Sequence, residues 1–470
     1  MTLEKKKTIG WEVYLFFALY IIAPSYLAVE LHSKLPLITL SRAVLMLMGL
    51  GLIIRRRREL FCLRKMHFNF TLTDDKFLRW GLVIYFVLML ITHLALVPAD
   101  AAEAVKALFT LVVEYYAMTW LLTLILDTRS KLLAALRTLV IAAGVTAIVS
   151  IVGCIFDTNP FHYLNTVERE MLMTTYYRLG VLRVEAGFGH PVFYGAFCAI
   201  ITPVMMYFYE DARTWGKKIF YGGCLTVNLV AMVLSNSRGS LLAFGGLVGL
   251  IVLMRLVTRR FGKFLLAYLP IAGATVVVLV GVTALTPTGT LLLKGIVDSL
   301  VAVFTPQQSA TGVQTPSDTP SAAPSEPVVD YGENAAGTRS RLVQMTGILY
   351  TLARKPIFGF GSNAHVRGLV KFEFRPGQWW ISKTFDMGIV SIVCQYGIVG
   401  LLAYISLYGA ILKTIICKKY HKDPLMQTLG LAFVTFLACL LAISSLNKVS
   451  WIMIAAVVCL VNIIRTEQEA

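Results

Sequence analysis

Long apolar runs, separated by short polar or basic segments, make up most of the chain. A helix needs about 20 apolar residues to cross the hydrocarbon core of a membrane, and the pattern predicts twelve such helices. We place them at Trp11–Leu31, Leu37–Ile54, Leu78–Val97, Ala104–Leu126, Leu132–Phe156, Pro191–Phe208, Ile219–Leu234, Ser240–Met254, Phe264–Leu285, Ile389–Ile411, Leu425–Ile443 and Val449–Ile464. The predicted fold is all-α: a polytopic membrane protein of about twelve transmembrane helices.

The composition agrees with this pattern, since 57% of the 470 residues are hydrophobic and only 15% are charged. A soluble core cannot hold that much apolar surface, so an ordinary soluble protein is excluded. The first apolar run is long and another follows at once, and we interpret it as the first transmembrane helix rather than a cleavable signal peptide. The eight cysteines are scattered singly without a C-x-x-C pair, so we expect no metal site, disulfide framework or cofactor.

The formal net charge of +17 comes largely from basic residues in every second connecting segment. Examples are Lys5–Lys7, Arg55–Arg58, Arg255–Lys263 and Arg465, whereas the intervening short connections hold few, and Pro98–Glu103 is acidic. Lys and Arg gather on the cytoplasmic side of membrane proteins, so the alternation predicts that both termini are cytoplasmic. We interpret the basic runs as contacts with anionic lipid and expect no nucleic-acid partner.

Two segments on the opposite side are too long to be simple connections, Asp157–His190 and Thr286–Thr384. The second segment separates the first nine predicted helices from the last three. We therefore expect helices one to nine within 1–285, a large external loop within 286–384, and helices ten to twelve within 385–470. Residues 305–337 of this loop are rich in Ser, Thr, Pro and Ala, a composition typical of disorder.

The last part of the loop carries a helical pattern. Residues 338–355 have the apolar spacing of an amphipathic helix, expected to end before Pro356 and to lie over the outer face of the transmembrane helices. The apolar positions are Leu342, Met345, Ile348, Leu349 and Leu352. Gly359 and Gly361 then mark a tight turn.

Arginines occur near several of the predicted external helix ends. Arg238 lies in the turn LSNSRGS between two apolar runs, where an isolated arginine can simply extend its side chain to the membrane surface. Arg183 precedes the sixth helix, and Arg339 and Arg341 begin the amphipathic helix. If these three segments converge, their guanidinium groups would match the oxygens of a diphosphate in bidentate pairs. No Walker-type glycine loop accompanies them, so ATP is not the phosphate indicated.

Five acidic or imidazole side chains lie near the same external face and could accept a proton from a hydroxyl group. They are Glu185, His190, His365, Glu373 and Asp386. Each one alone also fits a structural role, and His190, followed by Pro191, could simply begin a helix. Asp386 is the most notable, because it stands where the loop enters the tenth helix, a costly depth for a carboxylate without a partner.

Four segments, in this order, resemble motifs of the O-antigen ligase and polymerase superfamily, which are bacterial membrane glycosyltransferases. They are RVEAGFGHPVFYGAF, SNSRGSLLAF, RLVQMTGILYTLARKPIFGFG and QYGIVGLLAY, and they extend from Arg183 to Tyr404. Each motif is weak by itself. Together, on a frame of twelve helices with a large loop before the tenth, they are specific to this family.

The resemblance implies a GT-C-like enzyme that transfers a glycan from a polyprenyl diphosphate to a sugar hydroxyl outside the cytoplasmic (inner) membrane, with inversion and without metal. Arg183, Arg238 and Arg341 would hold the diphosphate and stabilise the charge left on it. Asp386, Glu185 or His365 would activate the acceptor. The implied partners are the polyprenyl-linked donor, a glycan or lipid-linked acceptor and membrane lipid, with a chain-length regulator or a flippase as further partners.

The residues eleven and ten positions before Gly397 bear on which branch of the family the chain resembles. Ligases, which attach the glycan to lipid A core, resemble each other in a His-Asn or similar pair there, whereas this chain has Asp386 and Met387. Aspartate is more like the polymerases of cell-surface polysaccharide, so polymerisation is favoured and ligation is the alternative.

A flippase or transporter of lipid-linked oligosaccharide is an alternative of another class, and a sensor or assembly protein is a further one. Against a transporter, the two halves show no internal repeat, and the notable charges are external rather than near the middle of the membrane. A sensor or assembly protein would not need arginines gathered on one face.

Overall fold

The computed structural model describes residues 10–60, 71–167, 176–178, 181–286, 338–375, 377–381, 384–441, 443 and 448–469. Within these residues, nine helices are long and apolar enough to cross a membrane, and three shorter apolar helices occupy the remaining predicted places. The prediction of an all-α, polytopic membrane protein is confirmed. The tract 305–337 lies outside the described residues.

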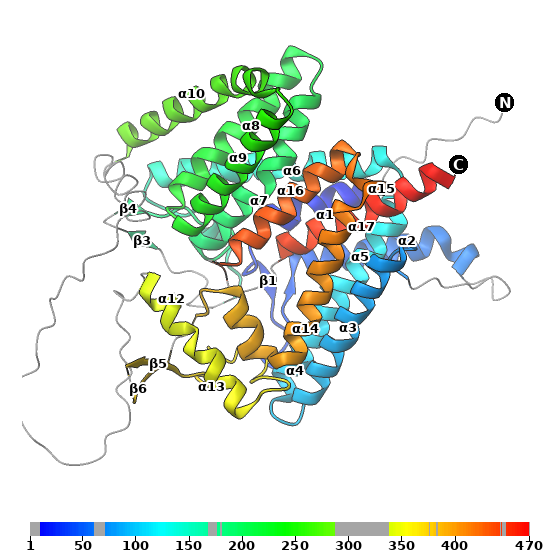
Figure 1. The fold of residues 1–470 in the computed structure, drawn as a ribbon, viewed down its shortest axis with the longest axis vertical. Helices are drawn as coiled ribbons and strands as arrows, with labels where there is room; N and C mark the ends of the chain where they lie inside the picture. The colour runs from blue at the N-terminus through cyan, green and yellow to red at the C-terminus, as the bar shows by residue number, and fades with distance from the viewer. Residues whose placement is uncertain are drawn as a thin grey trace, which may run out of the picture.

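Figure 1 shows the arrangement of the elements. The apolar helices are α1 (Trp11–Ile22), α2 (Leu40–Leu60), α3 (Lys76–Leu96), α4 (Ala101–Phe109), which continues through the π-helix η1 (Thr110–Ala117) into α5 (Met118–Ile125), α6 (Arg129–Ile155), α7 (Pro191–Asp211), α8 (Trp215–Leu234), α9 (Arg238–Val257), α10 (Phe261–Leu285), α14 (Gly388–Ile416), α16 (Pro424–Cys439) and α17 (Lys448–Glu469). The short helices are η2 (Pro160–Leu164), α12 (Thr338–Gln344), α13 (Thr346–Arg354) and α15 (Lys418–His421). Three antiparallel hairpins pair β1 (Ala28–Val29) with β2 (Ile38–Thr39), β3 (Tyr177–Arg178) with β4 (Val181–Leu182), and β5 (Phe372–Arg375) with β6 (Gln378–Trp380).

Polar residues just before the helices explain where several of them begin. The side chains of Asp75 and Asp423 accept hydrogen bonds from backbone N–H groups in the first turns of α3 and α16. His190 does the same for α7, because its Nδ1 accepts from the Val192 N–H at 3.1 Å. These caps pair N–H groups that a helix cannot pair internally.

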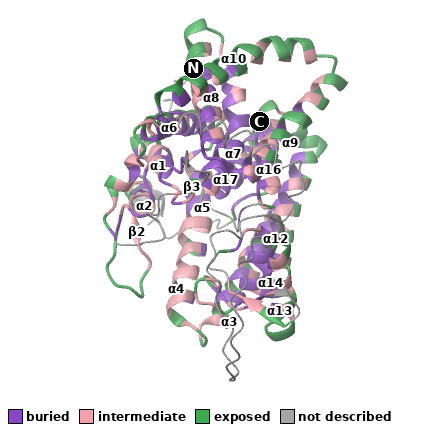
Figure 2. Cartoon of the chain, turned by 90° about the vertical axis from the view of Figure 1, so that its left-hand side faces the viewer, coloured by how far each residue is buried: buried purple, intermediate pink, exposed green. Residues whose placement is uncertain are grey.

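The helices pack around α7, which contacts α8, α9 and α16, while α14 packs along α3. Figure 2 shows buried residues gathered about α7 and α17, whereas α10 is largely exposed. Small residues permit close contact between membrane helices. Gly81 of α3 is one of them, since a Cβ there would collide with Ala410 of α14.

At one end of the bundle, the described residues of the long loop form a separate layer, which we call the cap (residues 338–375 and 377–381). Figure 1 shows α12, α13, β5 and β6 together beside the ends of α4 and α14. The cap has its own small hydrophobic cluster, which includes Val370 and Phe372 and continues into α14 through Val390 and Cys394. The cap is therefore packed on α14.

The structure differs from the prediction of one amphipathic helix over 338–355, because α12 and α13 are separate helices that meet at Met345. The predicted apolar stripe is the packed face only in part, since Ile348 packs against the cluster of the cap, whereas Leu342 and Leu349 are 67% and 69% exposed. Gln344 and Gly347 are on the packed face instead. Gly347 permits the contact, because a Cβ there would lie 2.5 Å from the ring of Phe372.

The helix α14 is broken at Gly397, whose φ of 62° and ψ of −156° are not helical. The broken ends are paired by the loop 356–361, where Gly359 and Gly361 have the positive φ values expected of a tight turn. Phe360 and Gly361 N–H donate to the carbonyls of Cys394 and Gln395, and Ile398 and Val399 N–H donate to those of Pro356 and Ile357, at 2.8–3.1 Å. Backbone N–H and C=O groups that a break leaves free in a membrane helix must bond to other parts of the protein. Two of the sequence motifs, PIFGFG and QYGIVG, therefore bind each other.

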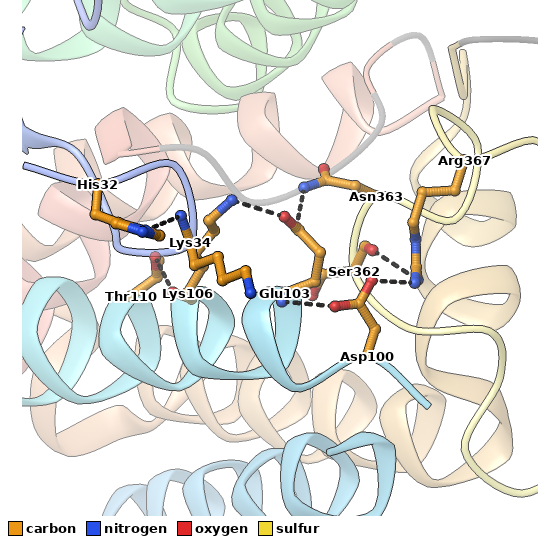
Figure 3. A network of polar contacts seen from close by, with 9 residues as sticks. All are labelled: His32, Lys34, Asp100, Glu103, Lys106, Thr110, Ser362, Asn363 and Arg367. Carbon is orange, nitrogen blue, oxygen red and sulfur yellow. Dashed lines mark hydrogen bonds and ion pairs between the residues drawn. The ribbon is translucent and has the colours of Figure 1, made fainter. Parts of the chain in front are cut away.

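A second contact joins the cap to the start of α4, as Figure 3 shows. The Arg367 guanidinium donates to the Asp100 carboxylate at 2.8 Å, and the Asn363 amide donates to Glu103 at 2.8 Å. Asp100 also caps α4 by accepting from the Glu103 N–H at 3.1 Å. The acidic residues at the start of α4 thus hold the cap at a second place, apart from its contact with α14.

We expect Arg367→Gln and Asp100→Asn each to lower the midpoint of thermal unfolding in detergent by about 1 to 3 °C, because the ion pair is partly exposed and worth at most about 1 kcal/mol. Asparagine still caps α4, so this change removes only the charge. The double variant should lose about as much as Arg367→Gln alone, because that change already removes the ion pair, together with the bonds from Arg367 to the Phe360 and Ser362 carbonyls. Additive losses would show that the two side chains act independently.

Candidate active site

Arg238 begins α9, directly after a turn that is packed into the protein. Ser235, Asn236 and Ser237 of this turn are buried. Gly195 of α7 makes room for them, since a Cβ there would lie 2.5 Å from Ser235 Oγ. Asn236 has a φ of 47°, the left-handed conformation in which the chain reverses between α8 and α9.

The guanidinium group of Arg238 is not a fully solvated surface group. The side chain is half-buried, and its Nε is enclosed without a hydrogen-bond partner among the residues that the structure describes. An enclosed N–H group without an acceptor is costly. The arrangement therefore favours an acceptor that the described residues do not supply.

Arg183 is fixed to the same turn. Its Nε donates to the carbonyl of Ser235 at 3.0 Å, and the neighbouring Val184 N–H donates to the carbonyl of Leu234 at 3.2 Å. These two bonds align the segment before α7 with the turn before α9. Arg183 and Arg238 are thus attached to one short stretch of backbone, although 55 positions separate them in the sequence.

The cap contributes Arg341 and a partner for Asp386. Arg341 and Gln344 are three residues apart in α12 and so lie on one side of that helix. The Gln344 amide donates to Asp386 Oδ2 at 3.2 Å and accepts from the Asp386 N–H at 2.9 Å. The Thr384 hydroxyl donates to the other carboxylate oxygen at 3.3 Å. Asp386 is therefore held just before α14 in a fixed orientation.

Arg341 connects the cap to the arginine of α9. It is close enough for its charge to act on both Asp386 and Arg238. Burial raises the pKa of Asp386, whereas the charge of Arg341 and the hydrogen bonds from Thr384 and Gln344 lower it. Because Arg238 and Arg341 repel each other, an anion between them would be stabilised by both.

His365 lies beside the segment that carries Asp386. Its ring packs against Phe385, with 4.6 Å between the ring centroids. Burial lowers the pKa of His365 to about 4, so the imidazole is neutral at neutral pH. Its Nδ1 is enclosed and has no partner within the described part of the chain.

Glu185 is placed differently, in an enclosed position where it is 3% exposed. Its Oε1 accepts from the Asn159 amide at 2.9 Å and lies 2.9 Å from His162 Nε2. Burial raises the pKa of Glu185 to about 7, against the lowering effects of the Asn159 hydrogen bond and the charge of Arg183. The carboxylate is therefore linked electrostatically to Arg183.

The remaining candidates have local contacts. His190 caps α7, and burial, followed by the charge of Arg183, lowers its pKa to about 4. Glu373 accepts from the Gly377 N–H within the β5–β6 hairpin. The side chain of Arg339 lies outside the described residues.

The comparison with known families bears on the part of this arrangement that begins within α8. Residues 223–405 match a family model described as O-antigen ligase. These residues belong to the O-antigen ligase/polymerase superfamily. No curated protein matches the chain. Membership of the superfamily implies an activity of the ligase or polymerase type, in which a lipid-linked glycan donor and an acceptor meet at a multi-pass membrane protein.

The range that matches the superfamily covers Arg238, Arg341 and Asp386, whereas Arg183 and Glu185 precede it. It also covers three of the four motifs by which the sequence resembled the family. The structure shows what two of these motifs do, since PIFGFG and QYGIVG bind each other across the break in α14. These two segments fix the loop 356–361 to α14 and supply no ionisable group to the site themselves.

Sequence reasoning missed three residues that hold the candidate site residues in place: Gln344, Asn159 and His162. Gln344 lies one helical turn after Arg341, so the two share a side of the helix, but an amide is common on any helix and does not by itself indicate a site. Asn159 precedes Pro160, a pair typical of a turn. Nothing in the local sequence distinguishes His162. Among the residues that the structure describes, no group of three or more His, Cys, Asp or Glu side chains is arranged to hold a metal ion.

Proposed function

We propose that the protein is a polysaccharide polymerase, which transfers a polyprenyl-diphosphate-linked glycan to a sugar hydroxyl. One observation carries this proposal: the charge of Arg341 acts on both Arg238 and Asp386, so two groups that could bind phosphate and a carboxylate that could accept a proton are within electrostatic range of one another. Arg183, held at Ser235, is the third arginine. We call Arg183, Arg238 and Arg341 the arginine clamp.

In the proposed reaction, the clamp binds the diphosphate of the donor. The acceptor hydroxyl attacks the anomeric carbon from the opposite side, the bond from that carbon to the diphosphate oxygen breaks, and Asp386 takes the hydroxyl proton. The diphosphate leaves with the electron pair, and three guanidinium groups stabilise its charge. The configuration is inverted, and no metal ion takes part.

Asp386 is the preferred base because the charge of Arg341, the clamp arginine of the cap, acts on it and because burial raises its pKa. A carboxylate with a raised pKa is a stronger proton acceptor near neutral pH. Burial instead lowers the pKa of His365, to about 4, which makes it a weaker base than an ordinary histidine. Gln344 would keep the carboxylate oriented through both of its hydrogen bonds.

The placement in the membrane belongs to the same proposal. Both termini would be cytoplasmic, and the cap and the clamp would be on the outer, periplasmic side of the inner membrane. The loop within 286–384 would divide nine helices from three. Partners that deliver donors or limit the chain length would approach from this outer side.

A ligase that attaches the glycan to lipid A core is the second candidate, because the matching family model is described as O-antigen ligase. The aspartate eleven residues before Gly397, where ligases resemble each other in histidine, supports the polymerase. The products distinguish the two. A strain without a polymerase accumulates single repeat units, whereas a strain without a ligase accumulates long lipid-linked polymer.

We expect a strain that lacks the protein to show single repeat units, and a plasmid with the wild-type gene to restore long polymer. Asp386→Asn should fail to restore it, with transfer at least about a hundredfold lower, because the amide cannot accept the proton. In purified protein, the wild-type rate should fall as the pH is lowered through the raised pKa of Asp386. The measurement is the glycan profile together with the abundance of the variant in the membrane.

Glu373→Gln is the matched control, since this carboxylate is in the same cap but contacts the backbone of its own hairpin. It should restore polymer fully. Long unattached polymer in the strain without the protein would overturn the polymerase in favour of the ligase. Full activity of Asp386→Asn would remove Asp386 from the role of base.

A further inference from the structure

A buried polar cluster lies beside the clamp and takes no part in the reaction proposed above. It joins Glu185 to Asn159 and His162 of the loop around η2 and to Tyr26, which follows α1. Glu185 Oε2 and the Tyr26 hydroxyl are enclosed and have no hydrogen-bond partner in the described part of the protein. A carboxylate enclosed in this way cannot touch the substrate, so any effect it has must pass through a neighbour.

The neighbour is Arg183, two residues away, because the charges of Glu185 and Arg183 act on each other. Arg183 is itself fixed by the hydrogen bond from its Nε to the carbonyl of Ser235. The other ionisable groups in contact are His162, whose pKa burial lowers, and Tyr26, and His190 also lies within reach of the charge of Arg183. A negative charge on Glu185 therefore offsets part of the positive charge of the clamp.

The contact between Glu185 and His162 can be kept in both protonation states. When the carboxylate is ionised, the imidazole N–H donates to it, and when the carboxyl group is protonated, its O–H donates to the neutral imidazole. Asn159 holds the segment independently, since its amide also donates to the Ala186 carbonyl at 3.1 Å. Protonation of Glu185 thus changes the charge beside Arg183 without requiring the backbone to move.

We propose that Glu185 is a positioning residue that sets, through Arg183, how tightly the clamp binds a diphosphate. The ionised carboxylate weakens binding and the neutral one strengthens it. The negative charge of a bound diphosphate disfavours the ionised form, so the carboxylate takes up a proton from solvent as the donor binds. This inference rests on the proposed function of the clamp. It is consistent with the pKa of about 7 that burial gives Glu185, since both states are then populated near neutral pH.

The test is the binding of a geranyl-diphosphate-linked glucose to the purified full chain at pH 6 and pH 8. This probe is a diphosphate diester, and its charge is the same at both pH values. For the wild type we expect the Kd to be roughly three- to tenfold higher at pH 8 than at pH 6, because the single charge of ionised Glu185 acts on the diphosphate from a moderate distance and is partly screened. Glu185→Gln, which is always neutral, should bind at both pH values as tightly as the wild type does at pH 6.

Two further variants sharpen the test. Glu30→Gln removes an exposed carboxylate from the segment between α1 and α2 and should behave like the wild type. Asn159→Ser keeps a side-chain oxygen that can accept from the Phe161 N–H at the start of η2, but it loses the amide that favours ionised Glu185. It should move the midpoint of the pH dependence to higher pH.

Three results would overturn the inference. Glu185→Gln could keep the pH dependence of the wild type, it could bind at both pH values as weakly as the wild type at pH 8, or the midpoint of Asn159→Ser could stay in place. Failure of the clamp itself would look different. In that case the wild type would not bind the probe at any pH, or Arg238→Lys would bind it unchanged.

Discussion

Arg238→Lys is expected to lower glycan transfer by about a hundredfold or more while the protein remains abundant in the membrane. Lysine keeps the positive charge but has no planar fork of donors, so it cannot bind two phosphate oxygens in one plane. The enclosed Nε of Arg238 would also be lost as a donor. The effect should be largest on kcat, because the clamp stabilises charge that develops as the glycosidic bond breaks.

Arg255→Lys is the matched control for this substitution. Arg255 is on the same helix, α9, but at its opposite end, where it pairs with Glu210 at 3.1 Å in an exposed position. The same chemical change should leave transfer within about twofold of the wild type. If both lysine variants transferred glycan normally, Arg238 would be no more than an interfacial arginine.

Gly397→Ala is expected to lower the free energy of unfolding by at least about 3 kcal/mol and to reduce the yield of folded protein sharply. The φ of 62° with ψ of −156° lies in a region that only glycine adopts readily. A Cβ would also meet the backbone of the cap, including the Ile357 carbonyl and, at 2.7 Å, the Gly359 nitrogen. Backbone atoms cannot rotate away, so the loop 356–361 would be displaced.

The control is Gly409→Ala, in the same helix twelve residues later, where a Cβ would meet nothing within 4 Å. Alanine in a helix interior is favourable by roughly 0.5–1 kcal/mol relative to glycine, so this variant should be at least as stable as the wild type. The measurement is the midpoint of thermal unfolding in detergent, together with the yield of monodisperse protein. Equal midpoints for the two variants would show that the break in α14 is not needed for the fold.

The membrane helices could be predicted from the sequence, and the cap could not. A run of about 20 apolar residues has one stable solution in a membrane, because the backbone must bond to itself. The cap is instead defined by contacts between distant segments. The spacing of Leu342 and Leu349 indicated an inward face, but the packed face holds Gly347 because small residues allow Phe372 to approach.

The candidate site could likewise be predicted only in part from the sequence. The types of residue and their order along the chain led to Arg238, Arg341 and Asp386, since bidentate groups and a carboxylate have few other uses at such positions. Gln344, which orients Asp386, could not be found in this way, because an amide is common on any helix. Nor does a local pattern show that Glu185 is enclosed, since burial depends on residues near 26 and 160.

The break in α14 also determines how the cap can move. Separation of the cap from α14 would leave four backbone hydrogen bonds unpaired at once, a cost of roughly 2–6 kcal/mol. The contact of Arg367 with Asp100 adds a further restraint at the other side. The cap and α14 are therefore expected to move together, and under the proposed function a lipid-tethered donor would have to reach Asp386 without the cap lifting away from α14.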